Sequence, residues 1–161
     1  MGILVFVESA EGKIRKTSLE AVAYAKAMGG QVTAIALGAT DRDELENLGK
    51  YGAEKVLHAA DGRLDKGVIQ AYSEVLVKAL QDEGADVLVL ANSSLGTPVA
   101  ARVAARTGAS LATNIVELPD TTSGFVVKKS IYTGKAFSFV ELKNQKKVIA
   151  IKKNAADVKE V

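Results

Sequence analysis

Residues 86–108 read DVLVLANSSLGTPVAARVAARTG and hold the pattern that decides the fold. Val87–Ala91 is a continuous apolar run with β-branched residues, which predicts a short strand buried on both faces. A polar turn, Asn92–Gly96, follows it directly. In an open parallel sheet, such a turn lies at the carboxyl ends of the strands, where ligands usually bind.

A helix is expected after this turn. We predict Thr97 as its N-cap and Pro98 as its first residue, where the missing N–H of proline costs no hydrogen bond. A helix that began at Ser94 would press the Pro98 ring against the Ser94 carbonyl, which favours the later start. Gly108 is expected to end the helix in the left-handed conformation.

The composition is that of an ordinary globular protein, with 48% hydrophobic and 25% charged residues in a chain of 161. One domain is expected at this length. The net charge of +2 gives no indication of binding to nucleic acid or to an anionic membrane. The chain has no cysteine, which excludes disulfides and thiolate metal sites and favours a reducing compartment.

The sequence also bears on where the protein is found. No apolar run approaches the length needed to cross a membrane, so we expect no membrane insertion. Met1 is followed almost at once by the first predicted strand, and we see no signal or transit peptide. We therefore expect a bacterial cytoplasmic protein, or a mitochondrial matrix protein if the sequence is a mature eukaryotic form.

Strands and helices alternate through the first two thirds of the chain. Four successive β-then-α units predict a doubly wound α/β fold, in which helices cover both faces of a five-stranded parallel sheet. The five expected strands are Ile3–Val7, Gln31–Leu37, Glu54–His58, Val87–Ala91 and Leu111–Leu118.

The helices between these strands have sequence signals at their ends. Thr17 and Glu20 form a capping-box pattern before an alanine-rich helix that runs to Met28. Asp41 with Glu44 opens a shorter helix. A long helix after residue 66 has a regular apolar face. The residues of that face are Ile69, Tyr72, Leu76 and Leu80.

The rhythm changes after residue 121. Phe125–Tyr132 and Ala136–Leu142 are β-rich runs separated by Thr133-Gly134-Lys135, which predicts an antiparallel hairpin. Lys146–Ile151 is one further strand. We expect the hairpin and this strand to form an antiparallel part that is appended to the parallel core.

Residues suited to catalysis or metal binding are scarce. His58 is the only histidine, and the G-x-S-x-G pattern of a serine nucleophile is absent. One histidine, no cysteine and no clustered carboxylates give no set of metal ligands. We therefore expect no catalytic residues and no metal site, and we interpret His58 as a structural residue.

The serine-glycine turn leaves two interpretations open. The free N–H groups and positive partial charge of a helix N-terminus favour a bound phosphate, so this crevice is a candidate nucleotide site. However, neither glycine-rich nucleotide motif occurs, which favours a purely structural turn. The residues expected at the lip of the crevice are Ser9, Asn92, Ser93, Ser94 and Gly96.

Two pairs of residues are candidates for a partner interface. Arg102 and Arg106 are four apart on a helix, where like charges repel slightly, and either a solvated face or a partner contact explains them. Phe137 and Phe139 alternate with small and aliphatic residues along the second hairpin strand, and we expect both rings to face outward. A register shifted by one residue would instead bury them.

The stretch SSLGTPVAARVAARTGASLATNIVEL (93–118), followed by SIYTGKAFSFVEL (130–142), resembles the amino-terminal domain of the electron transfer flavoprotein alpha subunit. ILVFVES (3–9), SLEAVAYAKAMGGQVTAIALG (18–38) and YGAEKVL (51–57) also fit that domain. The resemblance implies an adenine nucleotide alpha hydrolase-like fold with extra antiparallel strands. It also implies a heterodimer with the family's beta subunit.

The sequence departs from the family pattern at its end. Family members continue into a second domain that binds FAD, whereas this chain stops at Val161. The resemblance therefore implies that FAD is bound outside this chain, and none is expected on it alone. The link after the last strand is Lys152–Ala155 here and Arg-Pro-Gly-like in the family. We expect a domain of residues 1–153, with 154–161 as a frayed tail or the start of a linker.

These observations lead to two hypotheses of different kinds. The first is a scaffold and interaction domain, without catalysis of its own, in a complex that accepts electrons from flavoprotein dehydrogenases. The second is a stand-alone nucleotide-binding module that resembles universal stress proteins. The family's beta subunit holds AMP with a longer Gly/Asp-rich loop, and the short turn at Asn92–Gly96 lacks those residues, which favours the first hypothesis.

Overall fold

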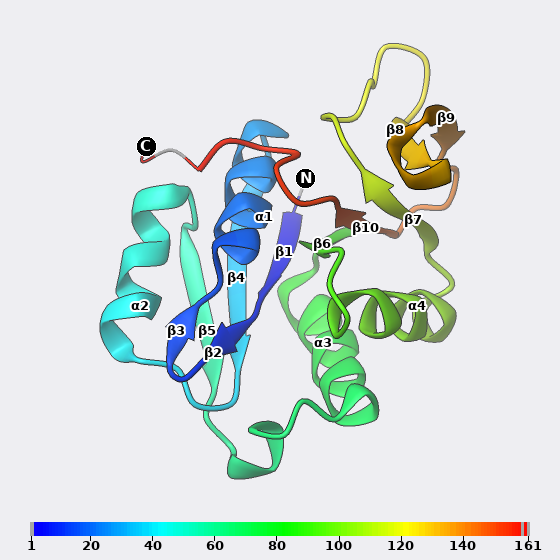
Figure 1. Ribbon diagram of the computed structural model, residues 1–161. Coiled ribbons are helices and arrows are strands. Elements are labelled where there is room, and N and C mark those ends of the chain that lie inside the picture. Colours follow the sequence, from blue (N-terminus) through cyan, green and yellow to red (C-terminus); the bar gives the residue numbers. More distant parts are fainter. Residues whose placement is uncertain (1, 159, 161) are drawn as a thin grey trace.

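An eight-stranded sheet runs through the molecule in the order β5-β4-β1-β6-β10-β7-β8-β9 (Figure 1). The structure is a computed structural model, and it describes residues 2–158 and 160. From β5 to β7 each strand is parallel to its neighbours, whereas β8 and β9 are antiparallel to theirs. The strands of this sheet are β1 (Gly2–Val7), β4 (Gln31–Leu37), β5 (Lys55–Ala59), β6 (Val87–Ala91), β7 (Ser110–Ile115), β8 (Val126–Ile131), β9 (Ala136–Glu141) and β10 (Lys147–Ile151).

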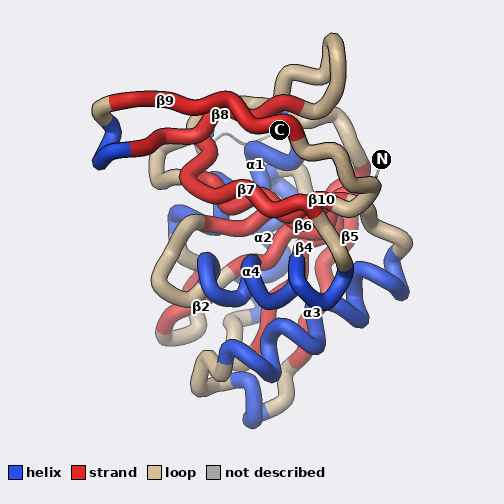
Figure 2. Tube along the Cα trace, turned by 90° about the vertical axis from the view of Figure 1, so that its right-hand side faces the viewer, coloured by secondary structure: helices blue, strands red, loops and turns tan. Residues whose placement is uncertain are grey.

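Helices cover both faces of the parallel part of the sheet. Figure 2 shows α3 and α4 packed side by side, and α1 lies against the opposite face. The helices are α1 (Lys16–Ala27), α2 (Arg42–Asn47), α3 (Ile69–Glu83) and α4 (Gly96–Thr107). A small hairpin of β2 (Ser9–Ala10) and β3 (Lys13–Ile14) connects β1 to α1. This arrangement confirms the predicted doubly wound α/β class.

The core is divided into two layers by the sheet. Along β1, Val5 and Val7 join the layer under α1, whereas Leu4 and Phe6 join the layer under α3 and α4. This alternation follows from the two-residue period of a strand. All five residues of β6 are buried, as the apolar run predicted. Folding removes these apolar side chains from water, and their burial is the main favourable term in the free energy of folding.

Strand β10 corrects one prediction. The run Lys146–Ile151 was expected in an antiparallel part outside the core, but β10 lies between β6 and β7 and is parallel to both. The parallel sheet therefore has six strands and not five. The physical reason is burial on both faces: Val148–Ile151 is a continuous apolar run, and such runs are typical of central parallel strands.

The predicted hairpin is present as β8 and β9, with Ser130 opposite Phe137 and Lys128 opposite Phe139. Tyr132–Gly134 forms the turn between them. Phe137 is 52% exposed and Phe139 70%, so the expected strand register is confirmed and the alternative of buried rings is wrong. Leu142, just after β9, is buried in the core.

Helix starts were predicted less well than strands. Arg15 and not Thr17 is the N-cap of α1, so the capping-box interpretation is wrong. Leu95 and not Thr97 is the N-cap of α4, and the helix begins at Gly96. In α4 the capping oxygen comes from outside the helix, because the Ser93 hydroxyl accepts the hydrogen bond of the Gly96 N–H at 2.8 Å.

Other helix features agree more closely with the prediction. Asp41 is the N-cap of α2 by backbone geometry, but Glu44 accepts a hydrogen bond from the Ile14 N–H instead of closing a capping box. On α3 the predicted apolar face is buried except at Ile69, which lies in the exposed first turn. Gly108 ends α4 with a φ of 70°, as predicted.

The segment after β10 is not frayed where it begins. The Asn154 N–H donates to the Glu20 carboxylate at 2.6 Å, and Glu20 is buried on α1. Ala155 and Ala156 pack against the core layer under α1. The expectation of a frayed tail from residue 154 is therefore wrong for these residues, while Lys159 and Val161 lie outside the described residues.

Gly96 provides a direct test of the β6–α4 turn. A Cβ atom added at Gly96 would lie 2.2 Å from the Ala91 carbonyl oxygen, which real atoms cannot do without a shift of the backbone. We expect Gly96→Ala to lower the free energy of unfolding by about 2–3 kcal/mol in urea denaturation. Gly49→Ala is the matched control, because nothing lies within 4 Å of its added Cβ, and it should change stability by less than about 0.5 kcal/mol. Equal losses of stability in the two variants would contradict the close approach of Gly96 to the Ala91 carbonyl oxygen.

Candidate functional site

The carboxyl edge of the sheet is occupied by side chains of the protein itself. Glu8 follows β1 and is only 6% exposed. The Ser93 hydroxyl donates to the Glu8 carboxylate at 2.7 Å and accepts from the Gly96 N–H at 2.8 Å. The Glu8 N–H in turn donates to the Ser18 hydroxyl at 2.8 Å. A continuous network therefore connects β1, the β6–α4 turn and the first turns of α1.

The electrostatics of this network disfavour a bound phosphate. Burial raises the pKa of Glu8, while the Ser93 hydrogen bond and the charge of Arg15 act in the opposite direction. The Ser93 hydroxyl is the single group between the Glu8 carboxylate and the N-terminus of α4. Since a helix N-terminus favours an anion, an ionised Glu8 already supplies the negative charge there. A phosphate in the same crevice would be repelled by this carboxylate. The geometry therefore favours the structural interpretation of the turn.

The other predicted lip residues are dispersed. The side chains of Asn92 and Asn114 are joined by a hydrogen bond of 2.9 Å, which fixes β6 to the end of β7. The Ser9 hydroxyl lies 3.2 Å from the Ala39 carbonyl, in a separate pocket beside the end of β4. Ser94 is exposed. Of the five lip residues, the structure brings together Ser93 and Gly96 through a direct contact.

Sequence reasoning missed Glu8, the residue that dominates this edge. A signal was present, because an acidic residue directly after a buried strand lies at the carboxyl edge of the sheet. Its partner Ser93 lies 85 residues further along the chain, and no local pattern joins the two.

The single histidine is the next candidate for a functional role. His58 Nε2 lies 2.7 Å from the Gly38 carbonyl, and since a carbonyl only accepts, this nitrogen carries the proton. That contact supports the structural interpretation of His58. Within residues 2–158 and 160, no group of three His, Asp or Glu side chains is arranged to hold a metal ion.

The two arginines of α4 lie on its outer face. Arg106 is 3.7 Å from the Glu74 carboxylate of α3, an exposed pair that adds little stability. Arg102 is exposed and has no acidic partner in the part of the chain that the structure describes. A solvated face explains Arg106, while Arg102 remains a candidate contact.

The two phenylalanines form a separate surface. Phe137 and Phe139 point outward from β9, which is the edge strand of the sheet. The Lys128 ammonium lies 4.4 Å from the centre of the Phe137 ring, within cation–π range. In Figures 1 and 2 the hairpin is separated from α4 by β7 and β10, so the arginine and phenylalanine pairs do not form one patch.

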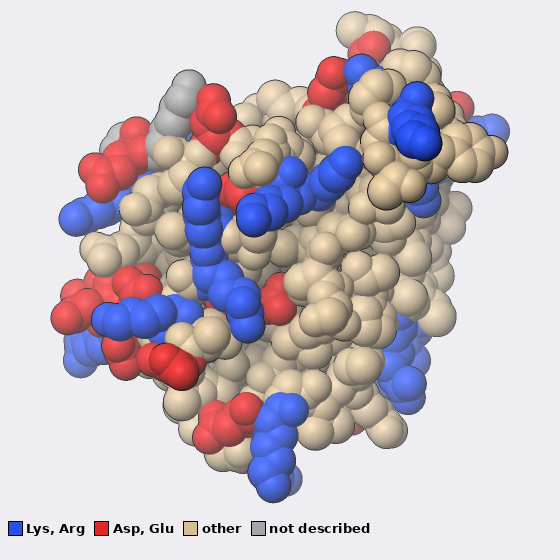
Figure 3. Space-filling model, viewed as in Figure 1, with Lys and Arg blue, Asp and Glu red and all other residues tan. Residues whose placement is uncertain are grey.

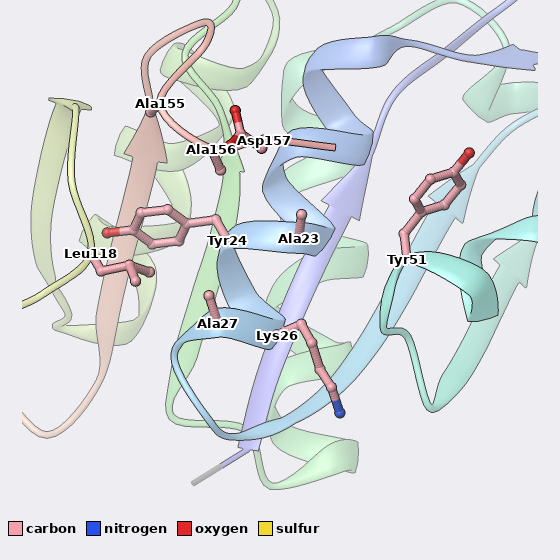
Figure 4. Close-up of a pocket in the computed structure, with 9 residues that line it drawn as sticks. All are labelled: Ala23, Tyr24, Lys26, Ala27, Tyr51, Leu118, Ala155, Ala156 and Asp157. Carbon is pink, nitrogen blue, oxygen red and sulfur yellow. The ribbon is translucent and has the colours of Figure 1, made fainter. Parts of the chain in front are cut away.

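A cavity of about 410 Å³ lies along α1 and beneath the segment after β10 (Figure 4). Tyr24 points toward Leu118, whereas Tyr51 lies on the other side of α1. The Tyr24 hydroxyl donates to the Glu117 carbonyl at 2.7 Å, and burial raises the pKa of this phenol far above its usual value. The side chain of Tyr24 therefore fastens the β7–β8 connection to α1, and the lining of the cavity is mostly apolar.

Comparison with known proteins identifies the family. A family model described as the electron transfer flavoprotein domain matches residues 3–161, and the chain belongs to this family. Electron transfer flavoprotein subunit alpha of Bacillus subtilis is 28% identical over 140 residues, which cover 86% of this chain and 43% of that subunit. Subunit alpha of Syntrophomonas wolfei is 27% identical over 157 residues, which cover 98% of this chain and 50% of that subunit.

A eukaryotic relative gives the same result. The probable mitochondrial subunit alpha of Saccharomyces cerevisiae is 28% identical over 157 residues, which cover 94% of this chain and 45% of that protein. The chain therefore spans about half the length of these curated relatives, and it corresponds to their amino-terminal half. The resemblance to the alpha subunit is confirmed.

Within the described residues, no helix is both long enough and apolar enough to cross a membrane.

The raised pKa of Glu8 has a measurable consequence for stability. The folded state holds a proton on Glu8 at a pH where the unfolded chain, with a pKa near 4.5, has released it. This residue therefore makes the free energy of unfolding fall as pH rises above that value. Glu8→Gln abolishes the titration but keeps an oxygen for the Ser93 hydroxyl. We expect the variant to become more stable relative to the parent chain as pH rises above 4.5, as urea denaturation will measure.

The control for this experiment is Glu11→Gln, which changes an exposed carboxylate near the same hairpin. Its stability relative to the parent chain should vary little over the same pH range. If the two variants behaved alike, the buried position of Glu8 would be contradicted.

Proposed function

We propose that this chain is a scaffold and interaction domain of an electron transfer flavoprotein alpha subunit, without catalysis of its own. The observation that carries the proposal is the family match over residues 3–161, in a chain that corresponds to half of its alpha-subunit relatives. The Glu8–Ser93 network supports it as well, because this network fills the edge at which an α/β domain usually binds its ligand.

In this proposal the complete protein is an electron carrier. Its FAD is bound outside this chain, and the whole complex accepts electrons from flavoprotein dehydrogenases and passes them to a membrane-linked acceptor. A beta subunit is the proposed partner. The proposed location is the cytoplasm of a bacterium, or the mitochondrial matrix if the source is eukaryotic, in keeping with the bacterial and mitochondrial relatives.

The outward face of β9 is the proposed partner surface. Exposed aromatic side chains in a monomer are typical of contact surfaces, and Phe139 is 70% exposed. We expect Phe139→Ala to weaken assembly with a beta subunit at least roughly tenfold, measured by titration of the two purified chains. The same change should cost the chain alone under about 1 kcal/mol, against about 3–5 for a buried phenylalanine.

Val68→Ala is the matched control, because Val68 is also an exposed apolar residue but lies next to α3, on a different element. It should leave assembly unchanged. Assembly that is equally insensitive to Phe139→Ala would place the interface elsewhere, with Arg102 and Arg106 as the next residues to test.

The alternative function is a stand-alone nucleotide-binding module. The serine-glycine turn before α4 favours it, because N–H groups at a helix N-terminus suit a phosphate. The scaffold proposal predicts that ATP or AMP does not bind at this turn, so the backbone amides of residues 92–96 should not shift in NMR spectra as either nucleotide is added. A micromolar dissociation constant, which corresponds to about −8 kcal/mol, would instead support the nucleotide-binding module.

A further inference from the structure

A second concave site lies apart from Glu8, beside the segment that follows β10. It is a cavity of about 310 Å³ between β8, the hairpin turn and the segment that follows β10. Its charged lining residues are Lys128, Lys152 and Lys153, with Glu117 as the one carboxylate. In the view of Figure 3, basic side chains gather over α1 and beside the end of β10. The charged lining of the cavity is therefore mainly basic.

The lysines of this cavity are only partly neutralised. The Lys128 ammonium pairs with Glu117 at 3.1 Å, which accounts for that carboxylate. Lys152 and Lys153 are exposed, and neither pairs with a carboxylate in the part of the chain that the structure describes. Two positive charges that line one cavity repel each other, and an anion bound in that cavity lowers this repulsion.

A buried hydroxyl group points to the same conclusion. Ser130 of β8 lines the cavity and is only 4% exposed. Its one hydrogen-bond partner among the described residues is the Lys152 ammonium, at 3.5 Å. An ammonium group has no lone pair, so Ser130 accepts in this contact and its own O–H is left without an acceptor. Buried hydroxyl groups nearly always find an acceptor, and the cavity is where one can be supplied.

We propose that this cavity binds the phosphate group of a small phosphorylated molecule. The unsatisfied groups of the cavity are donors: the ammonium groups of Lys152 and Lys153 have no carboxylate partner, and the Ser130 O–H has no acceptor among the described residues. A phosphate dianion has several acceptor oxygens at tetrahedral angles, so one group can accept from all three. Lysine is a common phosphate ligand because its ammonium acts as a compact point charge. The proposal does not depend on the scaffold function, although Phe137 of the β9 surface also lines this cavity.

The test is a titration of the chain with inorganic phosphate at constant ionic strength, followed by NMR of the backbone amides. We expect saturable shifts at Ser130, Gly134 and Lys153, which line the cavity. Lys152→Gln should weaken binding roughly tenfold, as the loss of one charged hydrogen bond implies. Lys50→Gln removes the same charge from a distant exposed position and should leave affinity within about twofold.

A second variant separates a built site from a general positive patch. Ser130→Ala leaves the net charge unchanged and should still weaken phosphate binding by about fivefold, because one donor is lost. The amide spectrum of the free variant verifies that it is folded. Shifts that do not saturate, an equal effect of Lys50→Gln, full affinity in Ser130→Ala, or equally tight binding of acetate would each overturn the proposal.

Discussion

Strand β10 is the connection on which the rest of the sheet depends. It lies between β6 and β7, so the backbone hydrogen bonds of the sheet pass through β10 from β7, β8 and β9 to the remaining strands. The Lys147 N–H donates to the Asp86 carbonyl at 2.9 Å, and the Asn92 N–H donates to the Ile151 carbonyl at 2.8 Å, one bond near each end of β6. Since β10 is the last of these strands in sequence, the sheet is complete only when β10 is inserted between β6 and β7.

The position of β10 also determines where the chain leaves the sheet. The segment after Ile151 emerges at the carboxyl edge, crosses to α1 and is held there by the Asn154–Glu20 hydrogen bond. The two lysines that begin this segment thereby face the hairpin, which places them beside Ser130. On the other side of β6, Glu8 closes the crevice through Ser93. The carboxyl edge of the sheet thus has a crevice that is closed by Glu8 and an open cavity that is lined by lysines.

The parts of the fold that could be predicted from the sequence are those set by local patterns. The β6 run, the β8–β9 hairpin and the outward rings of Phe137 and Phe139 follow from apolar periodicity and turn residues. The place of β10 could not be predicted, because its partners are set by the whole sheet and not by neighbours in sequence. The Glu8–Ser93 contact was missed for the same reason.

Glu8, held by Ser93, occupies the crevice before α4, where a domain of this class usually binds its ligand. The most direct test is to incubate the purified chain of 161 residues with FAD, remove free flavin by gel filtration and record the visible absorption spectrum. The scaffold function predicts a protein fraction without flavin absorption. A fraction that retains FAD in a one-to-one ratio would contradict it.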